Sequence, residues 1–535
     1  MRRWNGWGDE AIDYPAPPGA VQYLQQRLGE GLRLPDTDLA AVLATVPESR
    51  LRPHPLVVTG AEERLRHARG QSLPDWVALR SGRLGAFPDG VAYPASDDEV
   101  RALLAFARET GARLIPYGGG SSVVGHINPL PGEAPTLTVD LTRLNRLLAL
   151  DETSRLATFE AGTLGPEIEA QLRARGYTLG HFPQSFEGST LGGWIATRSS
   201  GQQSYYYGRI EDLFAGGHVE TPLGPWDLPP LPASAAGPDL RQVVLGSEGR
   251  FGVITRAVVR VRPLPETESF HGGFFREWES GMQAVREMAQ AGVGVSMLRL
   301  SDAVETETML KLAGHERLLA WAERGLRLAG YGPGRCLLLF GLTGSRREVA
   351  HARRAATEIV RAHGGLVVGE ALGKRWQKTR FRAPYLRNTL WELGYALDTL
   401  ETALPWSALP AAAEAIPNLL SNGLGERGER VLAFAHLSHV YADGASLYVT
   451  YLFRRAADPD ETLHRWRTLK DAASREIVAR GGTISHQHGV GLDHAPYLAN
   501  EKGAVGMAVL ESIRRTLDPE GLMNPGKLLS TEAVD

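Results

Sequence analysis

Two histidines stand one residue apart in a glycine-rich stretch, His486-Gln487-His488-Gly489-Val490-Gly491. Histidine changes its protonation near neutral pH, so this stretch suits proton transfer, and its glycines allow a close approach to a bound group. An H-x-H pair can also form half of a metal site, and His436, His439 and His494 lie nearby in the sequence. The pattern itself leaves acid–base chemistry and metal binding open.

Tyr448 lies in the run ASLYVTYLF, which predicts a strand. A phenol can act as a general acid or base, although its ordinary pKa of about 10 requires neighbours that tune it. A strand tyrosine is more often a core residue, so the position alone does not make Tyr448 catalytic.

Three consecutive glycines follow a predicted strand in Pro116-Tyr117-Gly118-Gly119-Gly120-Ser121-Ser122. Without Cβ atoms, such a loop lets backbone N–H groups converge on an anion. The loop has neither the lysine of a P-loop nor the spacing of a dinucleotide GxGxxG motif. Further glycine- and hydroxyl-rich segments occupy residues 184–193, 197–201 and 246–252. Together the four segments predict a site for a large phosphate-containing ligand.

The elements that must position these residues change in character along the chain. Residues 1–85 predict a helical, proline-punctuated region, and residues 86–265 begin with a strand, a capped helix, a strand and the glycine loop, a βαβ-type unit. Residues 266–475 alternate amphipathic helices with short strands, which predicts an α+β domain with an antiparallel sheet. Residues 476–535 are expected to form a C-terminal segment that returns to the ligand.

The composition is that of an ordinary globular protein, 43% hydrophobic and 22% charged, with a formal net charge of −3. That balance excludes nucleic acid as a partner. The single cysteine, Cys336, excludes an internal disulfide and indicates a buried thiol in a reducing compartment. The N-terminal arginines precede no apolar segment, and no stretch reaches the about 18 apolar residues of a membrane span. We therefore expect a cytoplasmic protein, with peripheral membrane contact left open.

Five segments occur in the order found in FAD enzymes of the vanillyl-alcohol oxidase or PCMH type: PYGGGSS, HFPQSFEGSTLGGW, TRSSGQ, YGRIEDL and GSEGRFGVIT. Within that type, the chain resembles the alkylglycerone-phosphate synthase family, from RWNGWG near its start to NPGKL at 524–528. The resemblance implies an α+β fold with a two-subdomain FAD-binding domain and a cap domain. The residues that it implies for FAD binding are Pro116, Tyr117, Gly118, Gly119, Gly120, Ser121, Ser122, Gln184, Ser185, Gly188, Ser189, Thr190, Gly193, Thr197, Arg198, Ser199, Ser200, Glu248, Gly249, Gly252, Val253 and Ile254.

The resemblance also assigns roles to the residues that could do chemistry. Tyr448 stands at the family's essential tyrosine, and 486–491 resembles its triple-histidine loop, with Gln487 in place of the middle histidine. Because glutamine cannot move a proton, only His486 and His488 remain as acid–base candidates, and no metal is expected.

Arginines and a further histidine complete the implied site. Arg387 matches the arginine that binds the substrate phosphate, and a guanidinium suits bidentate contact with phosphate. Arg299 and His181 match two further family residues, Thr399 replaces a serine, and His436 stands where the family has an arginine.

The reaction implied is exchange of the acyl group of acyl-dihydroxyacetone phosphate for a fatty alcohol, with FAD serving without net redox change. No histidine lies in a covalent-attachment motif, so dissociable FAD is implied. The partner is then a small lipid substrate, and a homodimer is left open.

One alternative is an FAD-dependent D-2-hydroxy-acid dehydrogenase, whose histidine loop overlays 487–491, although residues 441–448 lack the asparagine and final histidine of that group's metal motif. Another is a catalytically lapsed FAD-binding or lipid-carrier protein, motivated by Gln487 and His436.

Overall fold

The computed structural model describes residues 2–312 and 323–529. Its first sheet has four strands in the order β1-β2-β4-β3, and β2 and β3 both run parallel to β4. The strands are β1 (Val57–Val58), β2 (Gly90–Ala92), β3 (Arg113–Tyr117) and β4 (Thr136–Asp140). Helix α5 (Asp97–Thr110) joins β2 to β3, and the Ser96 hydroxyl caps it by accepting a hydrogen bond from the Glu99 N–H. The predicted βαβ-type unit is therefore present, and β3 ends directly at the glycine loop.

A second sheet of five antiparallel strands follows, in the order β5-β6-β10-β8-β9. Its strands are β5 (Leu147–Asp151), β6 (Leu156–Glu160), β8 (Phe214–Thr221), β9 (Gly224–Leu228) and β10 (Val253–Arg260). Helices α6 (Gly165–Arg173) and α7 (Leu191–Thr197) pack on it through a core that includes Phe159, Leu172 and Ile195. The two sheets confirm the expected two-subdomain arrangement.

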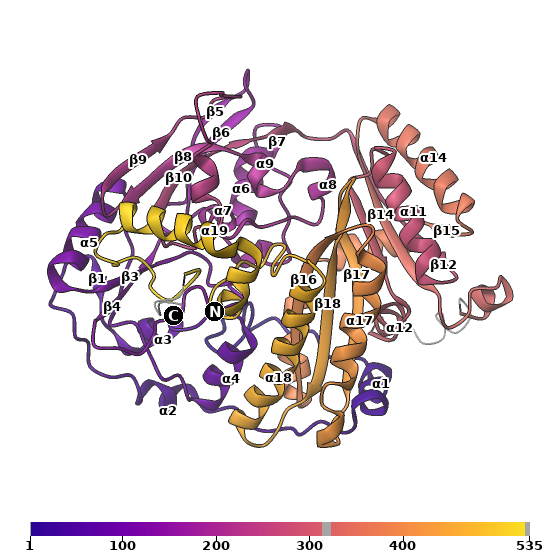
Figure 1. Cartoon of the computed structure of the whole chain (residues 1–535), viewed down its shortest axis with the longest axis horizontal. Helices are drawn as coiled ribbons and strands as arrows, with labels where there is room; N and C mark the ends of the chain where they lie inside the picture. Colours follow the sequence, from indigo (N-terminus) through magenta and orange to yellow (C-terminus); the bar gives the residue numbers. More distant parts are fainter. Residues whose placement is uncertain (1, 313–322, 530–535) are drawn as a thin grey trace.

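The third sheet is the largest, with seven antiparallel strands in the order β15-β12-β14-β13-β17-β18-β16. They are β12 (Thr267–Phe275), β13 (Met297–Ser301), β14 (Cys336–Gly344), β15 (Leu366–Gly369), β16 (Tyr395–Pro405), β17 (Val431–Val440) and β18 (Gly444–Arg454). Figure 1 shows this sheet beside the first two, as the expected α+β cap. The largest hydrophobic core lies between its strands and α11 (Trp278–Gln290), α14 (Arg346–Ala362), α17 (Leu409–Asn422) and α18 (Pro459–Ala479). Buried Cys336 belongs to that core.

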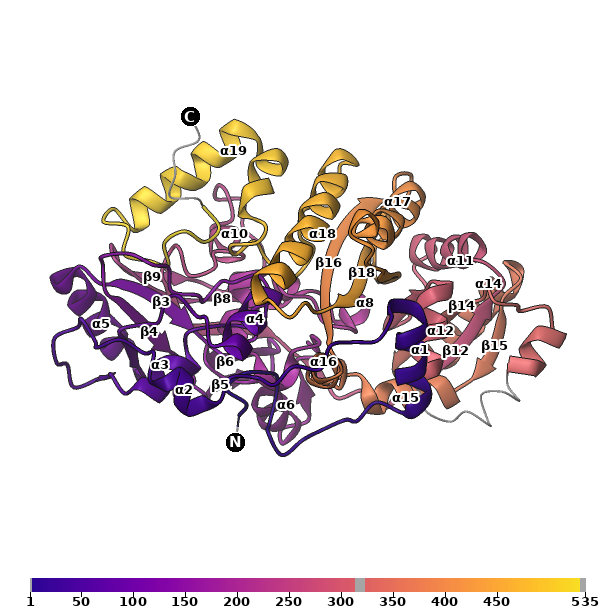
Figure 2. The same cartoon turned by 90° about the horizontal axis from the view of Figure 1, so that it is seen from below.

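The N-terminal region divides between the other parts. Helix α1 (Pro18–Leu28) packs on α12 (Ala303–Leu312) and β17 of the cap, and Figure 2 shows α1 beside α12. Helices α2 (Leu39–Leu43), α3 (Ala61–Arg66) and α4 (Leu73–Ser81) follow. The expected helical region also contains one strand, because β1 adds an antiparallel edge to β2.

The C-terminal residues return to the first sheet. Helices α18 and α19 (Ala495–Leu517) lie side by side, and α18 runs through the expected boundary between residues 475 and 476 (Figures 1 and 2). Met523 then forms a parallel bridge with Leu114 of β3, and the Asn524 N–H donates to the Leu114 carbonyl. Among the residues that the structure describes, no helix has the length and apolar character to cross a membrane.

Candidate active site

The four glycine- and hydroxyl-rich segments meet in space. Gly118 packs so closely on Thr190 that a Cβ at that glycine would overlap the threonine hydroxyl, and a Cβ on Gly119 would overlap the Gly188 carbonyl oxygen. In the fourth segment, a Cβ on Gly249 would lie 3.0 Å from the Pro116 ring. The third segment joins the fourth because a Cβ on Gly246 would lie 3.0 Å from the Arg198 side chain.

These contacts test whether a dinucleotide fits. Gly120 has a φ of +67°, a left-handed conformation that favours glycine, and the adjacent glycines leave only backbone between the first and second segments. The Tyr117 hydroxyl is buried beside this loop and interacts with the Arg2 guanidinium, which also lies next to Gly120. A glycine loop that has no room for Cβ atoms and an arginine beside it match what a diphosphate requires. The residues present therefore fit FAD.

Tyr448 lies at the centre of the cap side of the site. Its hydroxyl is 3.5 Å from His488 Nε2, and the two rings meet edge to face with centroids 5.6 Å apart. Its other face stacks on His436 at 4.9 Å. Burial raises the pKa of Tyr448, and a hydrogen bond with Thr399 opposes that rise only in part. The resting phenol is therefore protonated, so it can donate a proton before it can accept one.

Arg299 reaches Tyr448 only through His436. One Arg299 guanidinium nitrogen lies 3.1 Å from His436 Nε2, and the other donates to Glu305 at 2.8 Å. Glu305 also contacts His436 Nδ1 at 3.0 Å. The charge of Arg299 is thus compensated by the buried carboxylate of Glu305. Together the two residues hold the His436 ring on which Tyr448 stacks.

His486 faces away from Tyr448. Its Nε2 is 2.6 Å from the Tyr441 hydroxyl and 2.7 Å from an Arg209 guanidinium nitrogen, and its ring stacks on His439 at 5.0 Å. Burial is the main cause that lowers the pKa of His486, and the nearby charged groups add to it. Tyr441 and Arg209 also line a cavity of about 1300 Å³. The two histidines of the loop therefore have different neighbours: His486 contacts Tyr441 and Arg209, whereas His488 contacts Tyr448.

Two buried carboxylates hold the histidine loop from opposite sides. Glu401 of the cap accepts hydrogen bonds from the backbone N–H groups of Gln487 and His488, both at 2.7 Å. Glu248, from the fourth FAD segment, accepts from the N–H groups of Val490 and Gly491. The sequence predicts Glu248 as a cofactor residue, and its carboxylate in addition binds this loop and so ties the FAD segments to the histidines.

Arg387 lies close enough to Tyr448 for the two groups to interact electrostatically. Its guanidinium covers the Trp76 ring at 4.5 Å and donates to the Gln71 carbonyl at 2.6 Å and the Leu397 carbonyl at 3.3 Å. Burial lowers the pKa of Arg387, while the charges of Asp398 and Tyr448 act in the opposite direction. Within 2–312 and 323–529, no carboxylate lies at ion-pair distance from it. Its charge is available for an anionic group.

His181 is placed with the FAD segments rather than with Tyr448. Its Nε2 lies 3.2 Å from the Ser199 hydroxyl, and its ring packs on Trp194 at 4.8 Å. Burial, together with the charge of Arg209, lowers its pKa to about 3. His181 is thus a neutral, packed group and a poor proton carrier.

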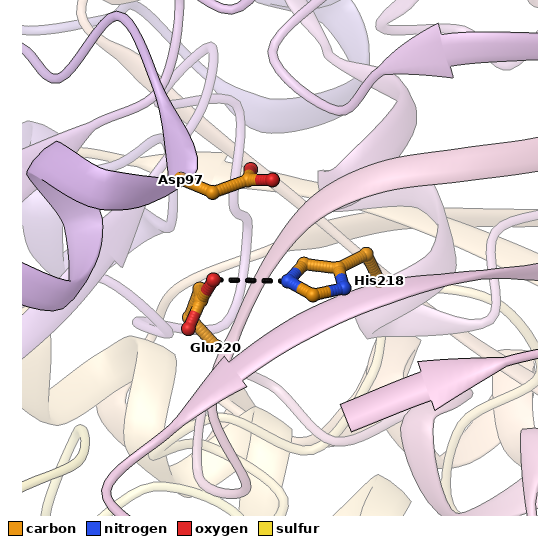
Figure 3. A group of neighbouring side chains, drawn as sticks. All are labelled: Asp97, His218 and Glu220. Atoms are coloured by element: carbon orange, nitrogen blue, oxygen red, sulfur yellow. Dashed lines mark hydrogen bonds and ion pairs between the residues drawn. The ribbon is translucent and has the colours of Figure 1, made fainter. Parts of the chain in front are cut away.

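Among the described residues, one group of side chains could hold a metal ion: Asp97, His218 and Glu220 (Figure 3). Each offers one possible ligand atom, and these atoms all lie within 4.8 Å of one another. Arginines already neutralise both carboxylates: Arg101 pairs with Glu220, and Arg256 with Asp97 at 3.1 Å. Both nitrogens of His218 are also engaged, because Asp227 takes Nδ1 at 2.6 Å and Glu220 takes Nε2 at 2.9 Å. The arrangement is a charge network with His218 at its centre.

This network predicts a pH dependence of stability. Burial lowers the pKa of His218, but its hydrogen bonds to Asp227 and Glu220 outweigh burial and raise it above the ordinary value. A raised folded-state pKa stabilises the fold below the unfolded pKa, and this contribution is lost as pH rises through the folded pKa. In His218→Gln we expect a smaller difference in melting temperature between about pH 5.5 and about pH 8.5 than in the wild type. Exposed His351→Gln is the control, and an unchanged difference in His218→Gln would contradict the role of this network.

Comparisons with known proteins agree with this geometry. Residues 88–226 match a family described as FAD binding domain, and residues 264–528 match the FAD linked oxidases, C-terminal domain. The alkyldihydroxyacetonephosphate synthase of Dictyostelium discoideum is 32% identical over 88% of this chain and 77% of its own length. The chain belongs to the alkyldihydroxyacetonephosphate synthase family. It is therefore an FAD-dependent enzyme, and the FAD expected from the glycine segments is its cofactor.

Solved structures place the family in the wider fold. A structure of alkyldihydroxyacetonephosphate synthase superposes with a TM-score of 0.84, at 27% identity and 98% coverage of both chains. p-Cresol methylhydroxylase shares the fold alone, with a TM-score of 0.66 at 13% identity over 96% of each chain. The predicted PCMH-type architecture is confirmed.

Several residues of the site were not singled out from the sequence. Glu401 and Tyr441 contact the histidine loop, and Arg209 binds both His486 Nε2 and the His486 carbonyl. Only Arg209 carried a usable signal, since it lies inside the YGRIEDL motif. The others stand on strands or beside them, where a polar residue gives no local sign of its partner.

Proposed function

We propose that this enzyme exchanges the acyl group of acyl-dihydroxyacetone phosphate for a fatty alcohol and so forms an ether-lipid precursor. The observation that carries the proposal is that Tyr448 of β18 lies in hydrogen-bond reach of His488, whose loop Glu248 ties to the FAD segments. FAD would supply an electrophilic carbon-binding centre without net redox change. The chain's own groups then have to bind the phosphate, move protons and exclude water.

Each of those tasks has a candidate in the site. Arg387, stacked on Trp76 and free of carboxylate partners among the described residues, would hold the substrate phosphate. Tyr448 would give a proton to a departing oxygen, and His488 Nε2 would receive a proton from the incoming alcohol directly or through the Tyr448 hydroxyl. The low exposure of His488, 15% for its side chain, keeps water from competing with the alcohol.

The test of this proposal is anaerobic incubation of the holoenzyme with acyl-dihydroxyacetone phosphate and a fatty alcohol while flavin absorbance is followed. Release of fatty acid and formation of the alkyl product without lasting bleaching would support it. Lasting bleaching by a D-2-hydroxy acid, with no exchange, would overturn it in favour of a dehydrogenase.

Arg387 gives a sharper prediction on the substrate. In Arg387→Ala, loss of a charge-assisted phosphate contact worth about 1.5–3 kcal/mol is expected to raise KM about 10- to 100-fold. Arg387→Lys keeps the charge and should raise KM less, and FAD content should stay unchanged in both variants. Arg382→Ala, an exposed arginine at the start of the same helix, α16 (Ala383–Glu392), is the matched control. Wild-type kinetics in Arg387→Ala would remove Arg387 from the site.

A further inference from the structure

Glu401 lies between the two histidines of the loop. It is fully buried on β16 and stands directly opposite Tyr448 in the pairing of β16 with β18. One oxygen, Oε1, accepts hydrogen bonds from the Ser485 hydroxyl and two backbone N–H groups and lies 3.6 Å from His488 Nδ1. The other oxygen, Oε2, lies 3.9 Å from His486 Nδ1. A single carboxylate therefore faces the same ring atom of both histidines.

The surroundings of His486 decide which of its nitrogens carries the proton. A guanidinium can only donate, so the Arg209 nitrogen 2.7 Å from His486 Nε2 makes Nε2 an acceptor. Burial lowers the pKa of His486 well below its usual value, so the ring is neutral and its one proton lies on Nδ1. Within the described residues, His486 Nδ1 and Glu401 Oε2 are both buried without another hydrogen-bond partner. The two atoms face each other at 3.9 Å, an ion-pair distance that is longer than a hydrogen bond.

The same assignment follows for His488. A carboxylate 3.6 Å from Nδ1 favours an N–H there over a lone pair, because the lone pair would face negative charge. Nε2 is then unprotonated and is the atom 3.5 Å from the Tyr448 hydroxyl. Both histidines thus present Nε2 as an acceptor to a tyrosine, Tyr448 on one side and Tyr441 on the other.

We propose that Glu401 is a positioning residue shared by two Tyr–His–Glu arrangements, in which it holds His486 and His488 as Nδ1–H tautomers. This inference rests on the proposed function only for the use of His488. In that step His488 Nε2 takes the proton of the incoming alcohol, directly or through the Tyr448 hydroxyl, the imidazolium faces Glu401 through Nδ1–H, and the carboxylate stays ionised. Once Tyr448 has given its own proton to the departing oxygen, Nε2 returns a proton to the phenolate, so both residues end as they began.

Other charges around the two rings do not replace Glu401. His486 faces Arg209, His439 and Tyr441, none of which carries negative charge at rest. His488 faces Lys470 and His126, which lower its pKa, and Asp398, which raises it less than Glu401 does. Glu401 is thus the largest stabiliser of an imidazolium at His488.

Glu401→Gln separates this role from loop anchoring. The glutamine carbonyl can still accept the Ser485, Gln487 and His488 hydrogen bonds, but its amide group would point an N–H at His486 Nδ1. In holoenzyme labelled with heavy nitrogen in histidine, nitrogen NMR is expected to show the Nδ1–H pattern for both histidines, assigned with His486→Ala and His488→Ala. In Glu401→Gln an N–H donor faces each nitrogen of His486, so its Nδ1–H pattern should give way to a mixture of tautomers, and the pattern should be kept in Glu501→Gln. Glu501 anchors the start of the same loop through Thr483 and Ile484 without reaching either ring.

The pH profile is the second measurement. Glu401→Gln is expected to lower kcat by roughly 10²–10⁴-fold and to move the acid limb of kcat to lower pH, because His488 loses the carboxylate that raises its pKa. A lower plateau with an unmoved limb, or Nε2–H tautomers in the wild type, would overturn the inference. The NMR result does not depend on the exchange reaction. A wild type without exchange activity would therefore overturn the proposed function, while the NMR measurement would still decide whether Glu401 holds the two tautomers.

Discussion

Tyr448→Phe is expected to lower kcat by roughly 10²–10⁴-fold, the usual worth of a positioned acid or base. The substitution removes only the hydroxyl that lies 3.5 Å from His488 Nε2. The ring keeps its stacking on His436 and its edge contact with His488, so the melting temperature and the FAD content should stay close to those of the wild type. Steady-state kinetics together with flavin absorbance and thermal unfolding check all three expectations.

Matched variants separate chemistry from packing at this position. Tyr395→Phe removes a buried hydroxyl from the neighbouring strand β16, where it donates to the Gly29 carbonyl, and should leave kcat nearly unchanged. His488→Ala should resemble Tyr448→Phe, and the double variant should cost little more than either single one, because groups that act as a unit are not additive. Full activity in Tyr448→Phe would rule out proton transfer by this residue.

Gly119→Ala is expected to abolish tight FAD binding. The new Cβ would overlap the Gly188 carbonyl oxygen, and since both partners are backbone, the glycine loop would have to separate from residues 184–193. The wild type should purify yellow, with about one FAD per chain that acid precipitation releases, because the residue pattern predicts no covalent attachment. FAD per chain, measured from flavin absorbance after acid release, and the change in melting temperature on adding FAD are the readouts.

Gly132→Ala is the control for this variant. Gly132 lies in an exposed part of the same domain, and a Cβ there would meet nothing within 4 Å. Its FAD content and stability should match the wild type. Full FAD content in Gly119→Ala would show that the loop is not the cradle, and a colourless, folded wild type that ignores added FAD would contradict the cofactor itself.

The features that depend on neighbouring residues could be predicted from the sequence alone. Ser96 before α5 specified a helix start, and three glycines after a β-strand specified an open backbone loop, because caps and glycine conformations act within a few residues. The order of the FAD segments and the H-x-H loop likewise sufficed for the family, the cofactor and the identity of Tyr448 and His488 as candidates.

How those candidates contact one another follows from the folded structure and could not be predicted from the sequence. Glu401 appears in the sequence as one polar residue in a strand, and its role arises from the register that sets it opposite Tyr448 and against a loop more than 80 residues further along. Glu248, predicted as a cofactor residue, also supports the histidine loop, and that contact too depends on the tertiary structure. His486 and His488, two residues apart, were separated into different surroundings by Arg209 and Tyr441. Strand register and the packing of the cap on the FAD domain set these pairs, and neither depends on a local pattern, because each follows from burying hydrophobic surface over the whole chain.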